Sequence, residues 1–197
     1  MTISASDVAK LRKMTGAGMM AAKKALQESS GDFDGAVDHL RKTGAAKAAK
    51  KADRTTSEGR VHCYTHSNGK IGVMVEVLCE TDFVARNEAF VSFCNDLALH
   101  IAAMSPLYTS EEDVPQEVLA KEKELIKEQL AQEGKPADML EKITEGKLGK
   151  YYEEVCLLNQ RFVKDEDLTI QAFLEKNIQS LGENIKIGRF SRMQIGE

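Results

Sequence analysis

The period of the hydrophobic pattern changes once along the chain, near Gly59, and this change most constrains the fold. Before Gly59, apolar residues recur at helical spacing. After it, apolar and polar residues alternate through residues 61–66 and 71–79, which is typical of β-strands. Asn68-Gly69 stands between these two runs and is a strong β-hairpin signal. The pattern therefore predicts a helical N-terminal part followed by a body with an antiparallel hairpin.

Residues 1–44 predict a unit of three short helices. Ser4, followed three residues later by Asp7, is a capping-box signature at the start of the first helix. The loop at residues 16–18 separates the first helix from the second, and Gly44 is expected to end the third. A unit of this size can bury only a small core, so we expect it to be marginally stable alone.

Residues 45–58 predict a linker, and residues 59–197 predict an α+β domain. The linker begins with an Ala- and Lys-rich run that has no apolar stripe, so we expect it not to hold the helical unit rigidly on the body. In the body, the periodicity predicts helices at about 90–105, 115–133, 137–155 and 168–181, and a strand at 184–195 with a candidate bulge at Gly188.

Composition and charge exclude several classes of protein. Hydrophobic residues make up 42% and charged residues 29% of the chain, close to average globular usage, which argues against a disordered or fibrous chain. Residues 1–58 carry eleven Lys and Arg against seven Asp and Glu, and the remainder carries sixteen against twenty-four. No long basic face is available, so we expect no direct nucleic-acid partner. No apolar run approaches the roughly 20 residues of a membrane span, so we expect no membrane partner.

Cysteine usage and the N-terminal residues indicate a cytoplasmic location. The 4 cysteines are scattered, and no two form a C-x-x-C pair. The first residues lack the basic and then apolar layout of a signal peptide. We therefore expect a reduced, cytoplasmic chain.

One glycine pattern raises the hypothesis of a nicotinamide-linked enzyme. Gly16–Ala21 matches G-x-G-x-x-A, and Asp38 follows about 20 residues later. The dinucleotide fingerprint requires a strand before the first glycine, whereas Val8–Met14 has helical spacing. The pattern therefore favours a structural turn, and we expect no cofactor.

The cysteine and histidine residues also lack the spacing of a zinc site or of a cysteine-nucleophile site. His62, Cys63 and His66 lie close in sequence, but the second ligand pair of a typical zinc site is missing. Cys94 and His100 are six residues apart on one predicted helix, which places them on different faces. We predict no metal site and no catalytic residue.

Two features leave alternatives open. Met19 and Met20 are adjacent on a helix, so at least one is expected to be exposed, either as a partner surface or through ordinary packing. Phe83 follows Asp82, which can cap the next helix, and it precedes Phe90 by seven residues. This spacing slightly favours a core Phe83, whereas an exposed Phe83 would stand at the tip of a rigid corner.

Several stretches together resemble the bacterial elongation factor Ts family, in its short form with a single core lobe. The resemblance covers nearly the whole chain and is most specific in Leu11–Met20 and Cys79–Arg86, with support from Lys23–Leu26, Ala45–Lys51, Leu99–Ala103, Glu133–Pro136, Phe162-Val163, Gly182–Ile185 and Arg189-Phe190. It implies a non-enzymatic guanine-nucleotide exchange factor that releases GDP from elongation factor Tu, with an N-terminal unit similar to ubiquitin-associated domains.

The resemblance also implies which residues contact the partner. The corner of Thr81, Asp82, Phe83 and Val84 is expected to dislocate the partner's Mg²⁺ and to disturb its phosphate-binding site. The remaining contacts are expected at Arg12, Met19, Met20, Lys23, His66, Phe162 and Val163.

The short form implies a homodimer, because longer family members carry two related core lobes. The second copy would replace the missing lobe, giving a complex of two exchange factors with two elongation factors. A different hypothesis is a peptide-binding adaptor that uses the three-helix unit, which would explain Met19 and Met20 but leave the body without a role.

Overall fold

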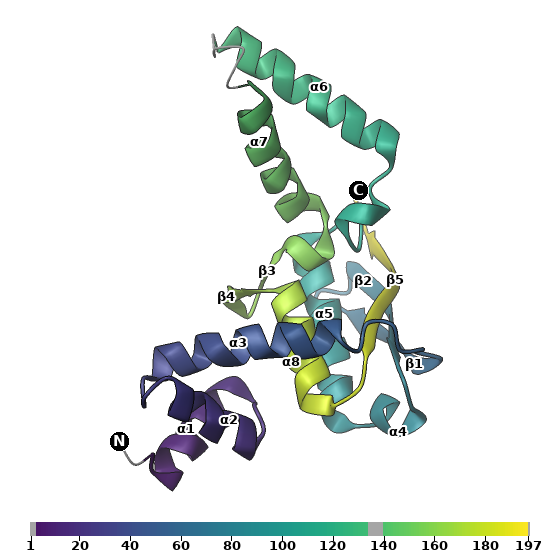
Figure 1. The fold of residues 1–197 in the computed structure, drawn as a ribbon. Helices are drawn as coiled ribbons and strands as arrows, with labels where there is room; N and C mark the ends of the chain where they lie inside the picture. The colour runs from purple at the N-terminus through teal and green to yellow at the C-terminus, as the bar shows by residue number, and fades with distance from the viewer. Residues whose placement is uncertain (1–2, 134–139, 197) are drawn as a thin grey trace.

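The computed structural model describes residues 3–133 and 140–196 and shows an α+β protein (Figure 1). Its α-helices are α1 (Ala5–Thr15), α2 (Met19–Glu28), α3 (Phe33–Ala49), α4 (Asp82–Ala85), α5 (Glu88–Met104), α6 (Gln116–Gln132), α7 (Leu140–Val155) and α8 (Ile170–Leu181). Its strands are β1 (Glu58–Thr65), β2 (Ile71–Cys79), β3 (Arg161–Phe162), β4 (Asp165–Thr169) and β5 (Ile185–Gln194). Two 3₁₀ turns, η1 (Glu111–Asp113) and η2 (Leu157–Asn159), complete the elements.

The three N-terminal helices form a unit with its own small core, as the sequence predicts. The capping box is present: the Ser4 hydroxyl accepts a hydrogen bond from the Asp7 amide at 3.1 Å, and the Ser4 amide donates to the Asp7 carboxylate at 3.3 Å. Gly16 follows α1 with φ +71°, a conformation that glycine adopts without strain. The core of this unit consists of Val8, Leu11, Ala17, Ala22, Ala25, Leu26, Ala36 and Leu40.

The third helix is longer than predicted. The expected end at Gly44 is wrong, because α3 continues to Ala49 and Ala48 joins the core of the body. Gly44 is buried, and a Cβ atom there would lie 2.8 Å from the side-chain oxygen of Gln179 on α8. A larger residue at position 44 would therefore require the Gln179 side chain to shift.

The segment after α3 contacts the body directly. The Lys51 ammonium donates to the Gly182 carbonyl at 2.5 Å. The Asn184 side chain donates to the carbonyls of Ala52, at 3.2 Å, and Arg54, at 3.0 Å. The expectation that this segment does not hold the helical unit on the body is therefore wrong. The domain limits 1–44, 45–58 and 59–197 remain a prediction.

The main sheet has three antiparallel strands in the order β1-β2-β5. The predicted hairpin at Asn68-Gly69 is confirmed, since the His66 amide donates to the Ile71 carbonyl at 2.9 Å across the turn. The predicted bulge is also confirmed: the β2–β5 register shifts between Val75 and Val77, opposite Gly188. A Cβ atom at Gly188 would meet the Glu76 carboxylate, so a larger residue there would require this side chain to shift.

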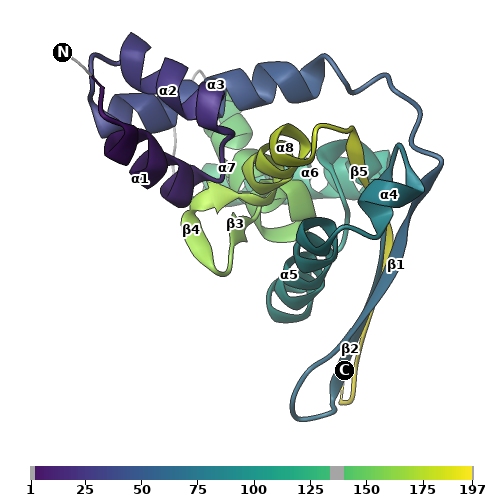
Figure 2. The same cartoon turned by 90° about the horizontal axis from the view of Figure 1, so that it is seen from below.

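One face of this sheet carries the core and the other is open. α5 and α8 supply Phe90, Phe93, Leu97, Ile101, Ile170, Leu174 and Ile178 to the core, and β2 supplies Val73, Val75, Val77 and Cys79. On the opposite face the side chains of Val61, Met74 and Met193 are exposed. Figure 2 shows α5 and the long β1–β2 hairpin from below.

Two further elements extend from this core. α6 and α7 form an antiparallel arm with a separate cluster of Ile126, Leu130 and Leu148 (Figure 1). The predicted break at 134–136 and the predicted helix start at 137 lie outside the described residues. The β3–β4 pair was not predicted, because residues 164–167 are charged and show no alternation.

Candidate partner-binding site

The corner between β2 and α5 carries the exposed aromatic side chain of Phe83. Thr81 is the N-cap of the short helix α4, and its hydroxyl accepts a hydrogen bond from the Val84 amide at 3.4 Å. Asp82 lies in the first turn of α4 and pairs with Arg86 at 3.3 Å. The N-cap of α4 is therefore Thr81 and not Asp82, which the sequence offered as a candidate. Thr81 takes that position because its backbone is extended, with φ −129° and ψ 155°.

The structure selects the exposed alternative for Phe83. Its side chain is 83% exposed, the highest value among the large apolar side chains of the described residues. Val84 packs partly against the body core and Ala85 is buried. The corner is therefore anchored through Val84 and Ala85, while Phe83 points into solvent.

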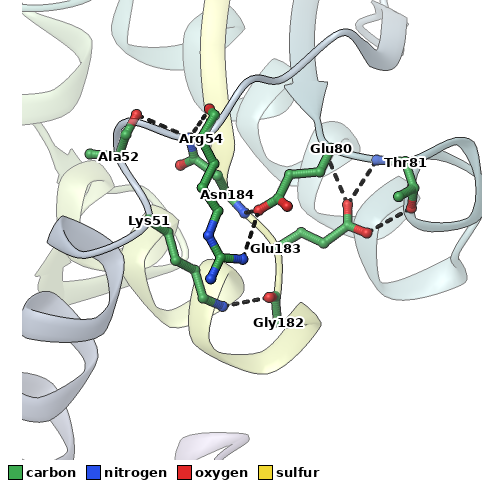
Figure 3. Close-up of polar contacts among 8 residues, drawn as sticks. All are labelled: Lys51, Ala52, Arg54, Glu80, Thr81, Gly182, Glu183 and Asn184. Atoms are coloured by element: carbon green, nitrogen blue, oxygen red, sulfur yellow. Dashed lines mark hydrogen bonds and ion pairs between the residues drawn. The ribbon is translucent and has the colours of Figure 1, made fainter.

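A single carboxylate braces this corner (Figure 3). Glu183, in the connection between α8 and β5, accepts hydrogen bonds from the backbone amides of Glu80, at 3.1 Å, and Thr81, at 3.0 Å. Its other oxygen accepts a hydrogen bond from the Thr81 hydroxyl at 2.6 Å. The start of α4 is thus tied to a segment about a hundred residues later in the chain.

A second carboxylate completes the connection in the opposite direction. Glu80 accepts the backbone amide of Asn184 at 2.6 Å and pairs with the Arg54 guanidinium at 3.4 Å. The hydrogen bond from Asn184, followed by the charge of Arg54, lowers the pKa of the Glu80 carboxyl below its ordinary value. Glu80, Glu183 and Arg54 were not among the residues predicted from the sequence. Glu80 lies in the Cys79–Arg86 stretch of the resemblance and Glu183 in the Gly182–Ile185 stretch, whereas no signal pointed to Arg54.

The candidate contacts on the helical unit are all exposed. Arg12 lies near the end of α1, and Met19, Met20 and Lys23 lie on α2, on the other side of the loop at residues 16–18. Both methionine side chains are exposed, so neither belongs to the core of the unit.

The remaining candidates lie elsewhere on the body. His66 is exposed at the β1–β2 turn, where its ring nitrogen lies 3.1 Å from the Tyr64 hydroxyl. Phe162 is buried and stacks on Phe173, with ring centroids 4.4 Å apart. The adjacent Val163 is exposed, and the contact of this pair with a partner remains a prediction.

A buried histidine holds Val163 in place. The Val163 amide donates to Nδ1 of His100 at 3.2 Å, and Nε2 of His100 lies 3.0 Å from the Gln160 side-chain oxygen. Nδ1 is therefore an acceptor and Nε2 carries the proton, which is the neutral form. Burial lowers the pKa of His100, which favours this form.

The candidate residues are spread over the molecule. In both Figure 1 and Figure 2, α4 and the α1–α2 unit lie well apart, although both lie along the lower side in Figure 1. A ligand that touches both must therefore be of macromolecular size. The described residues contain no group of three His, Cys, Asp or Glu that could hold a metal ion. No helix in this part of the chain is long and apolar enough to cross a membrane.

Known proteins of one family match this chain along its whole length. Residues 7–197 match the family described as "Elongation factor TS". The chain is 54% identical over 197 residues to elongation factor Ts of Geobacter sulfurreducens, covering 100% of this chain and 91% of that protein. It is also 54% identical to elongation factor Ts of Fervidobacterium nodosum, covering 100% of both chains, and of Thermosipho melanesiensis, covering 99% of this chain and 100% of that protein. These matches show that the chain, with its three-helix unit and its exposed Phe83 corner, belongs to the elongation factor Ts family.

Proposed function

We propose that this protein releases GDP from elongation factor Tu by inserting the Phe83 corner beside the Mg²⁺ and phosphate-binding site of that partner. The family is that of the non-enzymatic nucleotide exchange factors of translation elongation, so the protein acts in the cytoplasm, where elongation takes place. The observation that carries the proposal is the 83% exposure of Phe83 on a braced corner. Thr81 and Asp82 accompany it into the contact and Val84 anchors it.

The physical basis is coupling between two binding events. A factor that binds the nucleotide-free partner more tightly than the nucleotide-bound partner must weaken nucleotide and Mg²⁺ binding by the same ratio. A shift of a two-state population from 1:99 to 99:1 requires about 5.5 kcal/mol of differential binding. A buried aromatic hot spot contributes roughly 2–4 kcal/mol of this. No acid, base or cofactor is required.

The three-helix unit supplies affinity that does not depend on the corner. Met19 and Met20 offer flexible apolar contact area, and Arg12 and Lys23 surround it with positive charge. His66 and Val163 would make peripheral contacts.

We further propose that two copies pair through the open face of the sheet, giving a complex of two exchange factors with two elongation factors. Met193 on β5 is paired in register with Gly72 on β2 and is 76% exposed. Met74 and Val61 extend this apolar surface across β2 and β1. A self-complementary face of this kind suits a two-fold interface. A monomer in sedimentation at micromolar concentration would overturn this part of the proposal.

Release of dye-labelled GDP from elongation factor Tu tests the exchange mechanism. We expect the protein to accelerate release and Phe83→Ala to slow it, with the Mg²⁺-dependent part of the rate most affected. Leu107→Ala is the matched control, because Leu107 is a large apolar residue that is also strongly exposed and lies outside the proposed site. Phe83→Ala with an unchanged release rate contradicts the mechanism, and absence of any acceleration by the intact protein favours the adaptor hypothesis.

A further inference from the structure

We propose that Glu183 is a positioning residue for nucleotide exchange, which acts by holding the Phe83 corner in its exposed conformation. This inference rests on the proposed function of Phe83. Glu183 accepts three hydrogen bonds, all from Glu80 and Thr81, and each is formed with the segment that leads into α4. In this role Glu183 does not need to touch the partner.

The bond to the Thr81 hydroxyl sets the direction of the helix that carries Phe83. A hydroxyl has one proton to donate and two lone pairs. The Glu183 carboxylate can only accept, so the Thr81 hydroxyl donates its hydrogen bond to it at 2.6 Å. The Thr81 oxygen is then free to accept a hydrogen bond from the Val84 amide at 3.4 Å. Glu183 thereby orients the Thr81 side chain, and Thr81 in turn orients the first turn of α4.

Glu183 is itself held on both sides. Gly182 ends α8 with φ +81°, and its amide donates to the Ile178 carbonyl at 3.1 Å. On the other side, the Asn184 amide donates to the Glu80 carboxylate at 2.6 Å. Since Cys79 pairs with Ile185 in the sheet, these two carboxylates continue the β2–β5 contact beyond its last backbone pair. The brace is therefore an extension of the sheet and not an isolated surface contact.

A braced corner matters because an exposed aromatic residue on a loose loop must be ordered when it binds. That ordering cost reduces the binding free energy available for displacing Mg²⁺ and nucleotide. Loss of Glu183 leaves Phe83 present and exposed but no longer held in one orientation. We therefore expect the maximal rate of GDP release to fall more than the affinity of the protein for elongation factor Tu, to which the three-helix unit also contributes.

The experiment compares Glu183→Ala, Phe83→Ala and the double variant in GDP release at saturating exchange factor. We expect Glu183→Ala to slow release about tenfold, the scale of losing one charge-assisted hydrogen bond network. If Glu183 acts through Phe83, the double variant is no slower than Phe83→Ala alone. Glu183→Gln keeps an acceptor for the two amides but not for the Thr81 hydroxyl, so its release rate should lie between those of the unchanged protein and Glu183→Ala.

Two further measurements separate positioning from general stability. Asp113→Ala is the matched control, because the Asp113 carboxylate also accepts one amide and one hydroxyl, both from Ser110 at 2.8 Å, in a different loop. It should leave the release rate unchanged. Amide hydrogen exchange should accelerate at residues 80–84 in Glu183→Ala and stay unchanged in the β1–β2 hairpin. If Glu183→Ala does not fold, Glu183→Gln, which loses only the acceptor for the Thr81 hydroxyl, takes its place in the comparison with Phe83→Ala and the double variant.

The outcomes distinguish this inference from the proposed function. A normal rate for Phe83→Ala overturns the proposed function. A slow Phe83→Ala combined with a normal Glu183→Ala, or with effects that multiply in the double variant, overturns only the positioning role of Glu183.

Discussion

Phe83 and Phe90 lie on either side of the break between α4 and α5, and the first is 83% exposed whereas the second is completely buried. The two residues are therefore a matched pair for separating function from stability. Phe90→Ala should cost about 3–5 kcal/mol of unfolding free energy, because it opens a cavity in the core. Phe83→Ala should change it by no more than about 0.5 kcal/mol. Chemical denaturation of both variants checks this, and similar losses in the two would place Phe83 in the core.

Met20 and Met193 form a second matched pair, since their side chains are 75% and 76% exposed on different surfaces. Met20→Ala should weaken binding to elongation factor Tu by roughly tenfold, the effect of a single interface anchor, without changing self-association. Met193→Ala should weaken self-association and leave binding to elongation factor Tu intact. Calorimetry and sedimentation on both variants test the assignment, and exchanged effects would reverse it.

Asn184→Ala should loosen the segment after α3. Its side chain is buried and supplies hydrogen-bond donors to the carbonyls of Ala52 and Arg54. Ala52 and Arg54 are exposed residues, so water can replace the lost donors, and we expect a cost of about 0.5–1.5 kcal/mol of unfolding free energy. The backbone bond from Asn184 to Glu80 remains, so the corner should keep its protection from hydrogen exchange while residues 52–54 lose theirs. Equal loss at both sites would show that the two contacts form one unit.

Acid should destabilise the protein through His100. Burial lowers its pKa in the folded state below the ordinary value of 6.5, so the unfolded chain binds a proton that the folded chain does not. The resulting stability is complete above pH 6.5 and is lost as the pH falls below it. Unfolding free energies between pH 8 and pH 5 should show this decline, and His100→Gln should reduce its slope. The exposed His66→Gln is the control, and an unchanged slope in His100→Gln would contradict the assignment.

Thiol labelling should separate the four cysteines. Cys63 is exposed on β1, whereas Cys79, Cys94 and Cys156 are buried. Burial raises the pKa of Cys94 to about 12 and that of Cys156 to about 11, so their reactive thiolates are scarce at neutral pH. One thiol should react rapidly in the native protein, and Cys63→Ser should abolish that phase. Rapid reaction of a second thiol would show that the core opens locally.

Local signals were sufficient to predict most elements of the fold. The Ser4 capping box, the Asn68-Gly69 turn and the alternation through β2 depend on neighbours a few residues away, and all three are confirmed. Gly44 was misleading, because α3 continues through it and Gly44 lies buried beside Gln179 of α8, and no local pattern reports a contact over that separation.

The candidate site was harder to predict for the same reason. The seven-residue spacing of Phe83 and Phe90 suits one continuous helix, and only the Asn87 cap, whose side chain accepts the Ala89 amide at 2.8 Å, separates them. The bond from Thr81 to Glu183 joins residues 102 positions apart, so its partner could not be inferred from spacing. The exposure of Phe83 and its brace are properties of the assembled body.

The order of the strands in the main sheet has a consequence for synthesis. β2 is the central strand, and its second partner, β5, spans Ile185–Gln194. During translation β1 and β2 leave the ribosome as a two-stranded hairpin, which is at best marginally stable in water. The sheet and the Glu183 brace form only after residues 183–194 have emerged. A nascent chain that already displays the three-helix unit therefore holds Phe83 on an unfinished support until β5 pairs with β2.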